Sequence, residues 1–191
     1  MPRLISDAYQ KLNHELHAAE PTFGGQNRVV VLLPVIVDLA RVNKLKSVLD
    51  YGCGKGDLKP LLVKHAPQLD IREYDPAVPG KMWMPQPADI VCCLDVMEHI
   101  EPEFLEGVLQ HIRGLTIHCC VMRVSLRPAQ KILADGRNAH LILEKPEWWT
   151  GKIVPHFNIL KSGVQYKKNA PDALECIDYL LTPRTQPAAA P

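Results

Sequence analysis

Three glycines stand at alternate positions behind a short run of strand-forming residues, in the stretch VLDYGCGKGDL. Glycines placed in this way let a ligand approach the backbone closely. A dinucleotide loop would follow G-x-G-x-x-G, but Asp57 occupies the position of its third glycine, and a carboxylate there would repel a pyrophosphate. The phosphate-binding pattern G-x-x-x-x-G-K-S/T does not occur in this stretch either. Gly52, Gly54 and Gly56 therefore predict a nucleoside ligand without phosphates that carries a positive centre.

Acids follow the predicted strands on either side of this loop. Asp75 ends the next strand along the chain, where a carboxylate can accept hydrogen bonds from both hydroxyls of a ribose. Asp50 precedes the glycines, and Asp95 ends the third strand. Together they predict a negative potential around the pocket, which suits a ligand with a sulfonium and an ammonium group.

The elements that must position these residues alternate between strands and helices. We expect helices over 5–20, 27–43, 58–65 and 101–115, and strands over 47–50, 70–75, 88–95 and 116–124. The proline-rich segment 76–87 predicts a loop in place of a full strand and helix, and a helix or a strand pair follows up to about residue 182. This alternation predicts an α/β fold with a parallel sheet, whose ligand lies beyond the carboxyl ends of the strands.

Composition is typical of a globular cytoplasmic protein. The chain has 191 residues, a formal net charge of +1 and 47% hydrophobic residues, which argues against a surface built for large nucleic acids or for a membrane. Its longest apolar stretch, 29–37, is too short to span a bilayer, and the N-terminus lacks the apolar run of a secretory signal. Six cysteines show no C-x-x-C spacing, which favours buried thiols in a reducing compartment over a metal site.

Taken together, these motifs resemble those of a known protein family. LDYGCGKG, REYDP and ADIVCCLDVMEHIEPEFL resemble three motifs of the class I S-adenosylmethionine-dependent methyltransferases, over about residues 45–125. The chain is also similar to small methyltransferase-domain proteins of bacteria and their phages, through LDYGCGKG, YDPA-PG and DGRNAHLI---PEWW. The resemblance implies a Rossmann-like, doubly wound, mostly parallel sheet of seven strands with helices on both faces, and S-adenosylmethionine as cofactor.

The resemblance also assigns positions around the cofactor. It implies that Asp50, Gly52 and Gly54 line the methionine part, that Asp75 holds the ribose and that Pro76 lies near the adenine. The acid that usually meets the adenine amino group is missing from 76–87, so backbone groups or Met82 and Trp83 are expected to replace it.

The methyl acceptor is expected to be a small molecule such as a sugar, a nucleotide or a metabolite. Methylation of a nucleobase amino group would predict an Asn/Asp-Pro-Pro-aromatic motif where residues 95–98 stand, and carbon methylation of cytosine would need a Pro-Cys nucleophile. Neither pattern occurs, and the segment after residue 124 is short for a domain that recognises a large nucleic acid. The alternative is a protein that binds S-adenosylmethionine without transferring its methyl group and acts as a partner or an inhibitor. A dinucleotide-dependent oxidoreductase is a further, more distant alternative.

Two histidines are candidate catalytic bases, because imidazole exchanges protons near neutral pH. His99 follows Asp95 by one helical turn, although the resembling family carries Glu-His there for structural reasons as well. His140 lies in DGRNAHLILEKPEWW, where the family places residues that contact the substrate. The alternative for this segment is a scaffold, with a hairpin turn at Asp135-Gly136 and a tryptophan pair packed on the core.

One domain over 1–182 is expected, with a disordered tail over 183–191. Within it, 1–44 predicts a helical cap, 45–125 the cofactor-binding core and 126–182 the substrate side. In the cap, Tyr9 and the stretch 23–28 precede the first strand, and Gly24-Gly25 could hinge a lid. Arg28 is a candidate partner for the carboxylate of the cofactor, or an ordinary surface arginine.

Overall fold

A computed structural model describes residues 3–20, 22–24 and 29–185. The elements are helices α1 (Asp7–Ala19), α2 (Val29–Val42), α3 (Leu58–His65), α4 (Leu105–Leu115) and α5 (Pro146–Ile153), the short 3-10 helices η1 (Met97–His99) and η2 (Pro102–Phe104), and strands β1 (Ser47–Tyr51), β2 (Asp70–Tyr74), β3 (Ala88–Leu94), β4 (Thr116–Ser125), β5 (Phe157–Lys167) and β6 (Ala170–Pro183). No helix among these residues is long and apolar enough to cross a membrane.

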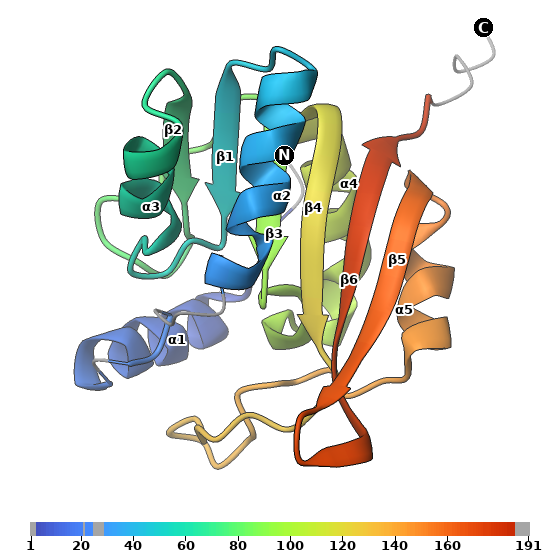
Figure 1. Ribbon diagram of the computed structural model, residues 1–191. Coiled ribbons are helices and arrows are strands. Elements are labelled where there is room, and N and C mark those ends of the chain that lie inside the picture. The colour runs from blue at the N-terminus through green and yellow to red at the C-terminus, as the bar shows by residue number, and fades with distance from the viewer. Residues whose placement is uncertain (1–2, 21, 25–28, 186–191) are drawn as a thin grey trace, which may run out of the picture.

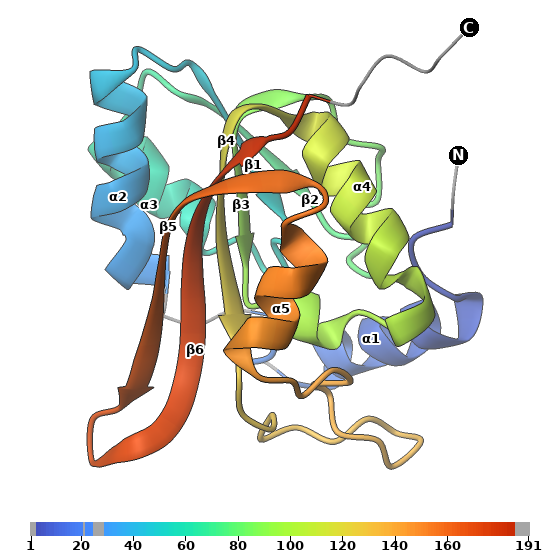
Figure 2. The same ribbon diagram turned by 90° about the vertical axis from the view of Figure 1, so that its right-hand side faces the viewer.

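The described strands form one sheet in the order β2-β1-β3-β4-β6-β5. The first four pair in parallel, while β6 runs antiparallel to both β4 and β5. Helices α2 and α3 cover one face, and α4 and α5 cover the other (Figure 1 and Figure 2). The doubly wound α/β prediction is confirmed by this arrangement and by the solved structures described below.

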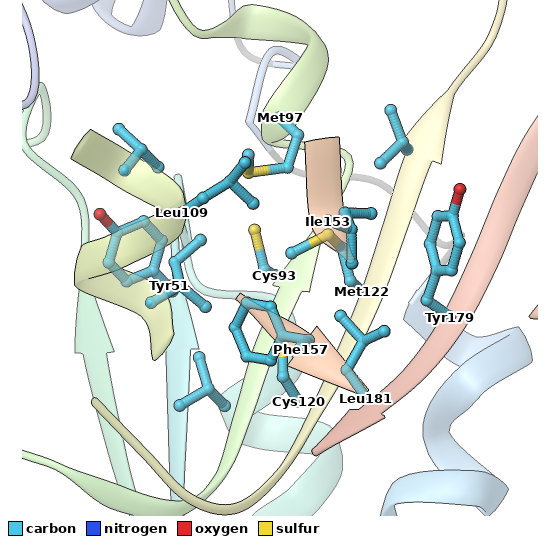
Figure 3. Close-up of a cluster of buried hydrophobic side chains, with 14 of the residues drawn as sticks. Tyr51, Cys93, Met97, Leu109, Cys120, Met122, Ile153, Phe157, Tyr179 and Leu181 are labelled. Atoms are coloured by element: carbon cyan, nitrogen blue, oxygen red, sulfur yellow. The ribbon is translucent and has the colours of Figure 1, made fainter. Parts of the chain in front are cut away.

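Side-chain alternation along the strands divides the core into two clusters, because successive residues of a strand point to opposite faces. Val48 and Ile90 pack under α2 and α3, whereas Leu49 and Val91 pack under α4 and α5. Figure 3 shows part of the second cluster, in which Phe157 lies among side chains of the sheet and of both helices. The six cysteines are free and buried.

The sheet has six strands where the resemblance implied seven. β2 forms the edge of the sheet, and 75–87 returns to β3 without a strand or a helix of its own. The prolines of this segment lack the amide hydrogen that strand pairing needs. The loop that the sequence predicted there therefore takes the place of the seventh strand.

Two further regions differ from the expected boundaries. Helix α2, expected within an N-terminal cap, packs against the sheet through residues such as Leu33 and Ile36. Only α1 extends across the carboxyl edge of the parallel strands (Figure 1). Toward the other end of the chain, β5 and β6 form the expected strand pair, and β6 reaches Pro183, the first residue of the expected tail.

Candidate active site

The glycine loop between β1 and α3 has a backbone geometry that requires glycine. Gly52, Gly54 and Gly56 have φ angles of 73°, 50° and 89°, in the left-handed region that favours glycine. The amide of Gly52 donates to the carbonyl of Tyr74 at 2.7 Å, which joins the loop to the end of β2. A Cβ added to Gly54 would lie 2.2 Å from the carbonyl oxygen of Gly24, so only glycine fits.

Asp75 binds backbone groups of two loops. Its Oδ2 accepts a hydrogen bond from the Gly54 amide at 2.9 Å, and its Oδ1 accepts one from the Ala77 amide at 2.9 Å. The sequence did not predict the contact with Gly54, because it depends on the pairing of β1 with β2. An ionised carboxylate has about four acceptor positions, so both oxygens retain capacity for a ribose.

The other two strand-end acids are also unusual: Asp50 in its pKa and Asp95 in its backbone conformation. Asp50 is buried at the end of β1, and burial, followed by the nearby charge of Glu73, raises its pKa to about 7. Asp95 has a φ of 56°, which is uncommon for a residue with a side chain. Its amide donates to the carbonyl of Arg123 at 3.0 Å, which fixes this turn at the end of β3.

A cavity of about 370 Å³ brings the predicted site residues together. It lies at the carboxyl edge of the parallel strands, and its lining includes Asp50, Gly52, Gly54, Asp75, Pro76, Asp95, His99 and His140. Arg28, the remaining candidate, lies outside the described residues. The site is therefore one cavity between the strand ends and α1.

The two candidate histidines lie in contact. Their ring centroids are 4.6 Å apart and the rings are nearly perpendicular. Nδ1 of His99 lies 2.8 Å from the carbonyl oxygen of Ala139, and Nδ1 of His140 lies 2.6 Å from that of Arg127. Because a carbonyl only accepts, each neutral ring carries its hydrogen on Nδ1 and directs the lone pair of Nε2 elsewhere.

Burial, and then the neighbouring His140, lowers the pKa of His99 to about 3. His99 is thus neutral across the physiological range and a weak base. Beside it, the buried Glu98 accepts a hydrogen bond on Oε1 from the Ser125 amide at 3.0 Å. Glu98 also lines the cavity, although sequence reasoning did not single it out. The signal that could have found it is its place in the Glu-His pair beyond the third strand.

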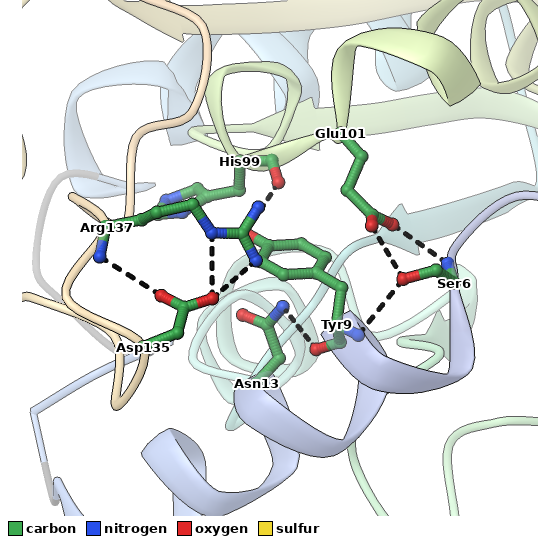
Figure 4. Close-up of polar contacts among 7 residues, drawn as sticks. All are labelled: Ser6, Tyr9, Asn13, His99, Glu101, Asp135 and Arg137. Atoms are coloured by element: carbon green, nitrogen blue, oxygen red, sulfur yellow. Dashed lines mark hydrogen bonds and ion pairs between the residues drawn. The ribbon is translucent and has the colours of Figure 1, made fainter.

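Helix α1 closes one side of the cavity through Tyr9, Asn13 and His17. Figure 4 shows how it is attached: the hydroxyl of Tyr9 donates to the carbonyl of His99 at 2.7 Å, and the amide and hydroxyl of Ser6 donate to the carboxylate of Glu101. The guanidinium of Arg137 lies over the Tyr9 ring, 5.5 Å from its centre. The cap and the segment that carries His140 are therefore in direct contact.

The tryptophans lie away from the cavity lining. Trp149 is fully buried in the core, and Trp148 packs against it with ring centroids 5.0 Å apart. Trp83 is 83% exposed and Met82 is 51% exposed, and neither lines the cavity. The expectation that Met82 and Trp83 contact an adenine is therefore not met in this structure, whereas Pro76 at the start of the same loop does line the cavity.

Comparisons with known proteins agree with this architecture. A family model described as a methyltransferase domain matches residues 25–146. No curated protein sequence matches the chain. The fold is similar to that of a 1,6-didemethyltoxoflavin-N1-methyltransferase from Burkholderia thailandensis, solved with 1,6-didemethyltoxoflavin and S-adenosylhomocysteine, with a TM-score of 0.67 and 13% identity over 97% of this chain and 93% of that one.

Two other solved structures show the same likeness. Magnesium protoporphyrin IX methyltransferase from Synechocystis, with bound S-adenosylhomocysteine, has a TM-score of 0.62 and 14% identity, over 91% of this chain and 99% of that one. The N-methyltransferase NodS from Bradyrhizobium japonicum, also with S-adenosylhomocysteine, has a TM-score of 0.59 and 14% identity, over 94% of this chain and 100% of that one. At such identities the likeness concerns the fold.

Proposed function

We propose that this chain transfers a methyl group to a small-molecule acceptor, such as a sugar, a nucleotide or a metabolite. The chain belongs to the methyltransferase-domain family and is an S-adenosylmethionine-dependent methyltransferase. The observation that carries the proposal is the convergence of the glycine loop, three strand-end acids and two histidines on one cavity of about 370 Å³. Such a volume, partly closed by α1, suits a compact ligand pair better than a polymer.

The residues of the cavity fit the cofactor. S-adenosylmethionine, when bound, supplies a methyl group on a positively charged sulfur. We assign Asp50, Gly52 and Gly54 to its methionine part, because the glycines let it approach the backbone and the buried carboxylate favours a cation. Asp75 is assigned to the ribose and Pro76 to the adenine side, since both line the cavity beyond β2.

The acceptor side is assigned to the histidines. His140 lies in the cavity wall with Nδ1 directed at a backbone carbonyl, and we assign to its Nε2 the role of taking the proton of an acceptor hydroxyl or amine. His99 positions the ring of His140 through their perpendicular contact and is itself too weak a base for this role. The small molecules named for the similar structures, 1,6-didemethyltoxoflavin and magnesium protoporphyrin IX, support a small acceptor here.

Calorimetric titration with S-adenosylhomocysteine tests the cofactor assignment. Asp75→Ala is expected to weaken binding by about 10–100-fold, because a charge-assisted hydrogen bond contributes roughly 1.5–3 kcal/mol. Asp75→Asn should lose less, since its amide oxygen still accepts one hydrogen bond. Asp172→Ala, an exposed acid on β6, is the matched control and should bind as the wild type does. Equal affinities of the Asp75→Ala and wild-type chains would contradict the assignment.

Turnover with a panel of small acceptors tests the other half of the site. His140→Ala is expected to keep the affinity for S-adenosylhomocysteine and to lose methyl transfer. Binding of the cofactor by the wild type without transfer to any class of acceptor would instead support a partner or inhibitor module.

A further inference from the structure

We propose that Glu98, His99 and His140 bind a divalent transition-metal ion in the wall of the cavity. One donor atom from each of these residues lies within 4.8 Å of the others, and all three residues line the cavity. They come from two segments that are distant in the sequence, η1 and the stretch after β4. No metal ligand was predicted from the sequence.

The donor set has the chemistry of a metal site. Two imidazole nitrogens and one carboxylate oxygen suit Mn²⁺, Fe²⁺, Co²⁺ or Zn²⁺ better than Ca²⁺ or Mg²⁺, which favour oxygen alone. Histidines that bind metal through one ring nitrogen usually donate the other N–H to a carbonyl or a carboxylate. His99 and His140 both have that second contact, from Nδ1 to the carbonyls of Ala139 and Arg127, so Nε2 is the ligand atom that each offers.

The backbone around the three ligands holds them in place. The Ser125 amide, at the end of β4, donates to the Glu98 carboxylate, and the Ile142 amide donates to the Glu98 carbonyl at 3.0 Å. The second bond ties η1 to the segment that carries His140. Ligands at 2.0–2.1 Å from a common ion are about 3.0–3.4 Å apart, so closing the cluster needs side-chain shifts of roughly 1–2 Å.

Three protein ligands leave coordination positions open toward the cavity. The inference thereby deepens the proposed function, on which this step rests, because an acceptor oxygen can fill one of those positions. A hydroxyl bound to the ion would lose its proton to water more readily, and its oxygen would then accept the methyl group that the cofactor supplies, with S-adenosylhomocysteine as the leaving group. Nε2 of His140 cannot hold an ion and receive a proton at once, so the ion replaces the imidazole as the group that activates the acceptor, and the acceptor is a hydroxyl compound.

Titration of the chelator-treated full-length chain with Mn²⁺, followed by the electron paramagnetic resonance signal of the free ion, tests the site directly. One Mn²⁺ per chain is expected. His140→Ala and His99→Ala should weaken binding by at least about 100-fold, since the loss of even an outer partner of a metal ligand costs roughly 10–100-fold. Glu98→Gln, which keeps an oxygen for the Ser125 amide, should also bind more weakly. His118→Ala, at a side chain that is 58% exposed on β4, is the matched control.

Absence of Mn²⁺ binding by the wild type, or equal binding by wild type and His140→Ala, would overturn the proposal. Co²⁺ absorption in the visible range gives a second readout, and thermal unfolding shows whether each variant is folded. Calorimetry with S-adenosylhomocysteine on the same samples separates the two proposals. Cofactor binding without Mn²⁺ binding refutes the ion site alone, whereas Mn²⁺ binding without cofactor binding supports the ion site and counts against the proposed function.

Discussion

Asp50 shows at the scale of one residue how the site departs from ordinary surface chemistry. Its carboxyl group is buried at the end of β1, near the acids Glu73, Asp75 and Asp57, and burial is the main cause that raises its pKa to about 7. In the unfolded chain the same group has a pKa of about 3.9. Protonation of Asp50 therefore stabilises the folded state relative to the unfolded state. This contribution is complete below about pH 4 and is lost as the pH rises through 7.

Replacing Asp50 by Asn tests this reasoning, because an amide keeps the shape and cannot ionise. The variant is expected to gain stability relative to the wild type as the pH rises from 4 to 7, by up to about 4 kcal/mol, with a constant difference above that range. Urea unfolding at several pH values measures the difference. Asp172→Asn, at an exposed position of β6, is the matched control. Parallel curves for Asp50→Asn and the wild type would show that Asp50 ionises normally in the folded chain.

At the scale of an element, the loop between β1 and α3 is fixed by contacts on both sides. Its amides reach the end of β2 and the carboxylate of Asp75, and the amide of Lys55 donates to the carbonyl of Gly24 at 2.7 Å. The added Cβ at Gly54 would meet that same carbonyl oxygen, which belongs to the backbone and cannot rotate away as a side chain would. The loop therefore couples the sheet to the segment that follows α1.

Gly54→Ala is expected to destabilise the chain by at least about 1–2 kcal/mol, the cost of a left-handed conformation for a residue with a Cβ, and to weaken cofactor binding. Gly151 in α5 provides the matched control, because a Cβ added there meets nothing within 4 Å. Gly151→Ala should stabilise the helix by up to about 1 kcal/mol. Chemical unfolding of the two variants measures both effects, and equal stabilities would refute the account of the loop.

At the scale of the whole molecule, α1 is attached to the domain by a small cluster of its own. Tyr9 packs with Leu133 and Ala139, apart from the two clusters that sandwich the sheet. Tyr9 donates to the carbonyl of His99, Ser6 at the start of α1 donates to Glu101, and Gln10 donates to the carbonyl of Pro76. A cap with few apolar contacts opens at lower free energy than the strands beneath it.

Hydrogen exchange should therefore be faster in α1 than in β1, β3 and β4 of the free chain. Added S-adenosylhomocysteine is expected to slow exchange in α1 more than in the hairpin β5–β6, because residues of α1 and of the ends of the parallel strands line the cavity. Tyr9→Phe removes one hydrogen bond of the cap and should speed exchange in α1 alone. Exchange in α1 of the free wild-type chain that is as slow as in β3 would contradict a separately opening cap.

Local sequence patterns were sufficient for most of the elements and for the position of the glycine loop. The apolar runs at 47–50 and 88–95 predicted β1 and β3, and Gly52 and Gly54 were expected in the loop that follows the first of these strands. The bond of Asp75 to the Gly54 amide, and the meeting of Glu98 with His140, could not be predicted from local sequence patterns. These contacts join residues far apart in the chain, and only the packed sheet determines them.

The loop that replaces the seventh strand also gives the protein a set of optical probes. Trp83 stands on this loop, exposed to solvent, while Trp149 is enclosed in the core with Trp148 beside it. Fluorescence that an aqueous quencher removes at once thus comes mainly from the loop, and fluorescence that resists the quencher comes mainly from the interior.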